Sequence, residues 1–209
     1  MLQTIRGIRI IYYTFSCIDK QFCYTCLMFK QTLSFFWEII KVAFLALVIV
    51  VPIRYFIFQP FIVKGASMEP NFRNGDYLIV DEISYRFRAP ERGEVIVFKY
   101  PNNLSEKFIK RVIGLPGEYL KFDGGKITIT KKDGSSIILD ESYYLYDESW
   151  SWNGEISLGE TEYFVLGDNR LHSYDSRNWG VLPQEYIIGR TIVRVFPPKA
   201  AAYFSVPAY

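Results

Sequence analysis

The sequence is poor in histidine and cysteine, and it carries almost no net charge. Its 209 residues include 1 histidine, His172, which excludes a multi-histidine metal site and any mechanism that needs two histidines. The 3 cysteines all precede residue 27, so no disulfide framework holds the remainder of the chain. The formal net charge of +2, from 24 basic and 22 acidic residues, lacks the basic excess typical of a DNA-binding protein. We therefore expect no metal, no cofactor and no nucleic-acid partner.

Apolar residues are concentrated in one run near the N-terminus. The 19 residues from Trp37 to Tyr55 would form a helix roughly 28 Å long, close to the hydrocarbon thickness of a bilayer. Residues 42–53 contain no charge, and aromatic residues at both ends match the two membrane interfaces. The run is too long and begins too late for a cleavable signal. We predict a transmembrane helix over 35–56; the alternative is a buried core helix.

The segment before this run sets the expected orientation. Residues 1–41 carry 5 basic and 2 acidic residues, which predicts that residues 1–34 are cytoplasmic and that the residues after the span lie outside. Cys23 and Cys26 form a CxxC pair without a second ligand pair, so we interpret them as thiols of a poorly structured tail. Because Met28 begins a natural membrane anchor, we hypothesise that residues 1–27 are not native.

After residue 57 the pattern changes to short β-rich runs. Lys126–Thr130 alternates strictly, Asp133-Gly134 marks a turn, and Ser136–Leu139 returns, which predicts a hairpin. We expect a mainly β protein, in which a single N-terminal transmembrane helix precedes an extracytoplasmic all-β domain with a small β insertion. The predicted parts are a main β domain (57–122 and 161–198), an inserted subdomain (123–160) and a tail (199–209). The predicted strands are Tyr77–Val80, Glu94–Tyr100, Phe108–Ile113, Tyr163–Leu166 and Thr191–Phe196.

Three segments are rich in chemically capable residues: Gly65–Pro70 (GASMEP), Phe108–Glu118 (FIKRVIGLPGE) and Gly167–Gly180 (GDNRLHSYDSRNWG). Each has an ordinary structural interpretation, as a turn, an edge strand with a solvated lysine, and a polar loop. On a strand, however, Lys110 would share a face with Phe108 and Val112. Burial there would lower the lysine pKa, and a neutral amine can act as a general base. A Ser-His-Asp triad through His172 stays open from the sequence, although Lys110 is the better-placed base.

Taken together, these segments resemble the bacterial type I signal peptidases, which are membrane-anchored Ser/Lys proteases. The likeness runs from about Phe35 to Pro198 and includes the anchor, the three segments and the strand sequence RGEVIVFKYP at Arg92–Pro101. It implies a serine endopeptidase at the outer face of the plasma membrane. Such an enzyme removes signal peptides from exported preproteins after Ala-x-Ala-like sites, through an acyl-enzyme.

The resemblance also implies residue roles. Ser67 would be the nucleophile, Lys110 the base, and Ser173 the hydroxyl that orients the lysine amine. Two ion pairs, Asp175 with Arg177 and Asp168 with Arg111, would brace the loop. The oxyanion hole would use the Ser67 N–H; Gly65 stands where some members add a serine, which leaves the second donor unassigned. His172 receives no catalytic role. The expected walls of the shallow substrate pockets are Phe61, Val63, Met68 and Ile109.

The same resemblance implies signal peptides, membrane lipid and the secretion translocon as partners. The apolar stretch Tyr55–Val63 is predicted to lie on the lipid surface, and a signal peptide could pair as an added β-strand. We interpret the aromatic cluster of the insertion as its core rather than a membrane contact; it comprises Tyr143, Tyr144, Tyr146, Trp150 and Trp152.

Two alternatives remain from sequence alone. A self-cleaving Ser/Lys peptidase of the repressor type would need a DNA-binding helical module where this chain has an apolar span. A membrane-tethered, non-catalytic β-barrel binding module would carry an inert Ser67. Reactivity of Ser67 toward a serine-directed acylating probe separates this last case from an enzyme.

Overall fold

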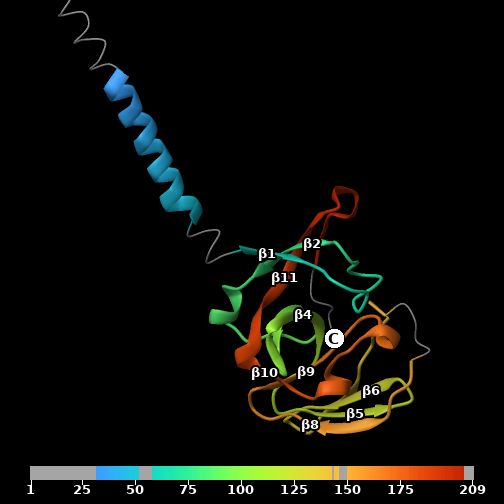
Figure 1. The fold of residues 1–209 in the computed structure, drawn as a ribbon. Helices are drawn as coiled ribbons and strands as arrows, with labels where there is room; N and C mark the ends of the chain where they lie inside the picture. The colour runs from blue at the N-terminus through green and yellow to red at the C-terminus, as the bar shows by residue number, and fades with distance from the viewer. Residues whose placement is uncertain (1–31, 52–57, 143, 146–149, 205–209) are drawn as a thin grey trace, which may run out of the picture. The chain divides into compact units, whose positions relative to one another are not determined.

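The computed structural model describes residues 32–51, 58–142, 144–145 and 150–204, which form part of two compact units, Met1–Pro52 and Ile53–Tyr209 (Figure 1). The first unit contains a helix at Thr32–Val51, whose 20 residues are apolar enough to cross a membrane. Its length is about 30 Å, and all its residues are exposed. The described helix includes residues 32–34, which precede the predicted span. The predicted end of that span and the hypotheses on residues 1–27, with Cys23 and Cys26, lie outside the described residues.

The second unit is mainly β, as predicted, and its larger sheet is antiparallel throughout. The strand order is β1-β2-β11-β3-β4-β9-β10, and β12 pairs with β11. Its members are β1 (Phe58–Ile62), β2 (Tyr77–Asp81), β3 (Val95–Tyr100), β4 (Asn103–Gly114), β9 (Glu162–Leu166), β10 (Leu182–Pro183), β11 (Ile187–Phe196) and β12 (Ala202–Tyr203).

The smaller sheet comes from the insertion and has the order β7-β6-β5-β8. Its strands are β5 (Tyr119–Asp123), β6 (Lys126–Thr130), β7 (Ser136–Ile138) and β8 (Gly154–Ser157), of which β5, β6 and β8 are labelled in Figure 1. The predicted hairpin is β6–β7, and Gly134 supplies the positive φ of +82° in its turn. The sheet begins at Tyr119 rather than at residue 123, because Leu120 and Phe122 already alternate as buried residues with exposed neighbours.

Three apolar cores lie around these sheets, and β4 contributes to all of them. Ile109 belongs to the core with Phe72 and Leu78, Val112 to the core with Phe98 and Tyr163, and Ile113 to the core under the smaller sheet. That last core also holds Tyr144 and Trp150, as predicted for the aromatic cluster, and Trp152 packs against it. Tyr143 and Tyr146 lie outside the described residues.

Two segments form strands that the sequence did not predict. Residues 58–62, part of the stretch Tyr55–Val63 predicted to lie on the lipid surface, form strand β1, in which Phe61 pairs with Leu78 of β2. Residues 202–203, placed in the tail, form β12, and the Phe204 ring lies 4.4 Å from that of Phe72. Short helices connect the strands: η1 (Ser84–Arg86), η2 (Arg170–His172), α2 (Ser176–Trp179), η3 (Gln184–Tyr186) and η4 (Pro198–Ala200).

Candidate active site

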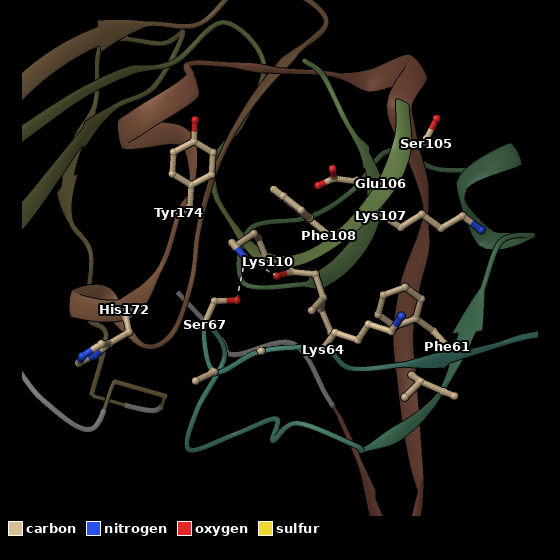
Figure 2. Close-up of a pocket in the computed structure, with 14 residues that line it drawn as sticks. Phe61, Lys64, Ser67, Ser105, Glu106, Lys107, Phe108, Lys110, His172 and Tyr174 are labelled. Atoms are coloured by element: carbon tan, nitrogen blue, oxygen red, sulfur yellow. Dashed lines mark hydrogen bonds between the residues drawn. The ribbon is translucent and has the colours of Figure 1, made fainter. Parts of the chain in front are cut away.

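The structure brings the predicted serine and lysine together. Lys110 Nζ donates a hydrogen bond of 2.8 Å to Ser67 Oγ and one of 3.0 Å to the carbonyl of Ile109, and Figure 2 shows the lysine amine pointing at the serine hydroxyl. Ser67 lies in the loop after β1, and Lys110 lies on β4. Gly65 opens the serine loop with a φ of +88°, a conformation that glycine adopts without steric cost.

Lys110 is 4% exposed, and this burial determines its protonation. Burial lowers its pKa from 10.5 to about 8 because an ammonium ion loses its hydration there; Asp175 and Asp168 oppose this shift, whereas Arg177 assists it. The Phe108 ring centroid lies 5.4 Å from the amine. The predicted apolar face shared with Phe108 and Val112 explains the burial of Lys110 only in part, because residues 109–114 are all buried, whichever face they lie on. Both faces of β4 are covered there, since the strand runs between separate cores.

Two buried ion pairs hold the loop that follows β9. Arg111 contacts Asp168 through two hydrogen bonds of 2.8 and 2.6 Å, and this pair joins β4 to the loop. Arg177 Nε and Nη2 each lie 2.8 Å from a carboxylate oxygen of Asp175. Asp175 also accepts a hydrogen bond of 3.0 Å from the Gly167 N–H. These are the pairs that the motif indicated, and each carboxylate is fully enclosed.

Ser173 does not make the contact predicted for it. Its Oγ is buried and has no hydrogen-bond partner among the described residues, so the expected bond to Lys110 is absent from this structure. The lysine amine instead directs its bonds to Ser67 and to Ile109. Ser173 nevertheless lies close to the serine loop, since the backbone of Gly167 touches both. A Cβ added at Gly167 would overlap the Ser173 Oγ and the Ser67 carbonyl oxygen.

Replacing Gly167 with alanine is therefore expected to displace Ser67 or Ser173 and to reduce kcat by about 100-fold, the usual cost of a misplacement near 1 Å. Steady-state cleavage by the folded variant measures this. The control is Gly189→Ala, whose added Cβ would overlap the Asp81 carbonyl on β2 instead. If both variants lose the same fraction of kcat, the close approach at Gly167 has no specific effect on the site.

Several positioning residues were missed from the sequence. Asn169 joins the two loops, since its N–H donates to the Ser67 carbonyl at 3.0 Å and its Nδ2 to the Ala66 carbonyl at 3.1 Å. Its place beside Asp168 in the third motif was the available signal. Asn71 Nδ2 bonds to Asp168 Oδ2 at 2.9 Å and to the Tyr144 carbonyl at 2.7 Å.

The insertion also supports this loop. Arg170 Nη1 donates to Glu141 Oε2 at 2.9 Å, and its guanidinium lies 4.7 Å from the Trp150 ring centroid. Arg177 lies 5.6 Å from the same ring. No local pattern indicates these contacts, because Glu141 and Arg170 are 29 residues apart.

A cavity of about 650 Å³ opens over Ser67 and Lys110. Of the four predicted pocket walls, Phe61 and Ile109 line it. Val63 and Met68 do not; they are 2% and 1% exposed and pack in the core beneath the site. The sequence alone could not tell a cavity wall from a core position, because an apolar residue beside a nucleophile is compatible with both.

The Gly65 N–H is already occupied, since it donates to Asn74 Oδ1 at 3.0 Å. Gly65 is therefore not available as the second oxyanion donor in this conformation. No group of three His, Cys, Asp or Glu side chains in the described parts of the chain is placed to hold a metal.

A serine hydroxyl bonded to a buried lysine amine lies in the wall of an open cavity on a β body, an arrangement in which an adjacent base can activate a serine. The profile of the family described as "Signal peptidase, peptidase S26" matches residues 36–196, and the chain belongs to this family. The predicted resemblance is thus confirmed. The chain is a serine endopeptidase that removes signal peptides, which excludes the repressor-type and non-catalytic alternatives.

Relatives of known name match most of the chain. It is 38% identical over 165 residues to "Probable signal peptidase I-2" of Synechocystis sp. (77% of this chain, 73% of the relative). It is 41% identical to "Signal peptidase I" of Leptolyngbya laminosa, over 77% of this chain and 79% of the relative. It is 34% identical to "Thylakoidal processing peptidase 1, chloroplastic" of Arabidopsis thaliana, over 81% of this chain and 51% of the relative. A signal peptidase I structure from Enterococcus faecalis V583 is 31% identical and aligns with a TM-score of 0.40, covering 49% of this chain and 97% of that one.

Proposed function

We propose that Ser67 and Lys110 form the catalytic dyad of this signal peptidase. The observation that supports the dyad most directly is the 2.8 Å bond from a buried amine to the serine hydroxyl. Neutral Lys110 takes the Ser67 proton while Oγ bonds to the carbonyl carbon of the scissile peptide. The resulting ammonium returns a proton to the leaving amine as the peptide bond breaks. Lys110 then deprotonates a water molecule, which hydrolyses the ester and frees Ser67.

The surrounding residues position this dyad in the proposed mechanism. The ion pair Asp168–Arg111 fixes the loop against β4, and the pair Asp175–Arg177 braces the loop internally. Ser173 fills the space beside Ser67 across Gly167. The Ser67 N–H donates to the developing oxyanion, a contribution typically near 3 kcal/mol. Phe61 and Ile109 form the apolar walls that accept the small residues of an Ala-x-Ala-like site.

The proposed location is the outer face of the plasma membrane, with signal peptides as substrates and lipid and the translocon nearby. The apolar helix Thr32–Val51 supports a single membrane span. The net positive charge of residues 1–41 supports a cytoplasmic N-terminus, because basic segments are retained on that side.

The pH dependence of the reaction tests the dyad. Because burial lowers the Lys110 pKa to about 8, the amine is protonated below that pH and neutral above it. We expect kcat/KM for a preprotein to rise about tenfold per pH unit up to pH 8 and then to level off. The same profile should govern acylation of Ser67 by a serine-directed probe, followed by mass spectrometry.

Lys107→Met is the control, because Lys107 is an exposed lysine on the same strand. This variant should keep the midpoint of the profile. A midpoint near 6.5, the ordinary pKa of histidine, would point instead to His172. A flat profile between pH 5 and 9 would refute lysine as the base.

A further inference from the structure

A second cavity, of about 320 Å³, adjoins the first. Glu69, Pro70 and residues 168–172 line it, and His172 is a wall of both cavities. In Figure 2, Ser67 lies between Phe61 on one side and His172 on the other. The second cavity therefore begins beside the nucleophile, on the side away from Phe61.

The wall of this cavity is joined directly to the nucleophile loop. Asn169 lines it and bonds to the carbonyls of Ala66 and Ser67, at 3.1 and 3.0 Å. His172 Nδ1 lies 3.2 Å from Asn169 Oδ1. These bonds fix the position of the cavity relative to Ser67. A substrate peptide bound in the cavity therefore lies at a defined distance from the peptide bond that is cleaved.

The direction of the substrate identifies which part of it reaches this cavity. This step rests on the proposed function, in which the residues before the scissile bond contact Phe61. An extended chain advances about 3.3 Å per residue, so the next two or three residues extend for roughly 7–10 Å beyond Ser67. They leave on the His172 side and meet the second cavity.

The charges around the cavity do not cancel. Asp168 is neutralised by Arg111, and Arg170 by Glu141. Glu69 is half-buried and forms no ion pair within the described residues. Its carboxylate is therefore left to interact with whatever occupies the cavity, and a partly desolvated carboxylate attracts a cation and repels an anion.

We propose that the second cavity binds the first residues of the mature protein, on the leaving side of the scissile bond, and that Glu69 selects basic over acidic side chains there. Glu69 acts as a specificity residue, since it lies two positions after Ser67 without contacting the dyad. The favoured substrates are preproteins whose mature part begins with a basic or neutral segment.

The test uses the full-length protein in detergent and three preproteins that are identical up to the cleavage site. They carry Lys, Gln or Glu at the second position after the scissile bond. We expect kcat/KM to be about tenfold higher for Lys than for Glu, and Glu69→Gln to bring this ratio close to one. High salt should reduce the wild-type ratio only in part, because a half-buried carboxylate is screened less than an exposed one.

Glu106→Gln is the matched control, since it removes one carboxylate from the rim of the first cavity and should keep the wild-type Lys-to-Glu ratio. The proposal is overturned if wild type shows no preference, or if Glu69→Gln keeps the full ratio. It is also overturned if Glu106→Gln removes the ratio as completely as Glu69→Gln does. A failure to cleave any of the three preproteins would instead refute the proposed function.

Discussion

Replacing Lys110 with methionine is expected to abolish signal-peptide cleavage and, at neutral pH, to make the protein more stable. Without its base Ser67 is a poor nucleophile, so kcat should fall by at least about 10⁴-fold, as it should in Ser67→Ala. The gain in stability has a separate cause. Lowering the lysine pKa from 10.5 to about 8 corresponds to about 3 kcal/mol of unfavourable burial. Losing the hydrogen bonds of the amine offsets part of this, which leaves a gain of about 1–2 kcal/mol.

The pH dependence of the free energy of unfolding shows whether the gain comes from the buried amine. Below pH 8 the amine is protonated in both the folded and the unfolded protein, so the cost of burial is fully present. Between pH 8 and 10.5 only the unfolded protein keeps the proton, and the wild type recovers the difference as pH rises. Urea unfolding at pH 7 and pH 10 measures it. Lys107→Met, at an exposed position, should show no such gain; an equal gain would refute the argument from burial.

Replacing Asp168 with asparagine is expected to destabilise the protein by about 3–5 kcal/mol, the usual cost of breaking a buried ion pair. The cost arises because the Arg111 guanidinium stays enclosed between β4 and the loop after its counter-ion has gone. Urea unfolding followed by tryptophan fluorescence measures the change. Since Asp168 also accepts a bond from Asn71, the variant should loosen both loops of the site.

A double-mutant cycle separates the pair from its surroundings. Adding Arg111→Met to Asp168→Asn also removes the buried guanidinium that has lost its carboxylate, so the double variant should be more stable than Asp168→Asn alone. Glu155→Gln is the control, because Glu155 pairs with Lys121 on the exposed face of the smaller sheet. It should have no measurable effect. Strict additivity of the two site substitutions would contradict the proposed coupling.

Where the signal is local, the sequence predicted which residues lie together in the structure. Ser67, Lys110 and the two Asp–Arg pairs lie in compact motifs, and the hairpin at Asp133-Gly134 has a strong turn signal. Burial was harder to predict. Val63 and Met68 were expected in the cavity wall, but they pack in the core, because an apolar side chain beside a site gives no indication of its direction.

Very short strands and contacts across long sequence separations were not predictable. Strands β10 and β12 have two residues each, too few for any periodic pattern to appear. The bond between Glu141 and Arg170 depends on how the insertion folds back, and neither residue has a local signature. The family resemblance implies a bond from Ser173 to the lysine amine, whereas in the structure the amine bonds to Ser67 and to the Ile109 carbonyl.

The contact of the Trp150 ring with both Arg170 and Arg177 constrains how this enzyme can be recombined with its relatives. The smaller sheet looks like an exchangeable module, since it is built from one continuous segment. Its connection between β7 and β8, however, supplies the Trp150 ring that both arginines contact and the Glu141 carboxylate that binds Arg170. A chimera that imports another insertion must therefore bring equivalents of Glu141 and Trp150, or exchange the two arginines together with it.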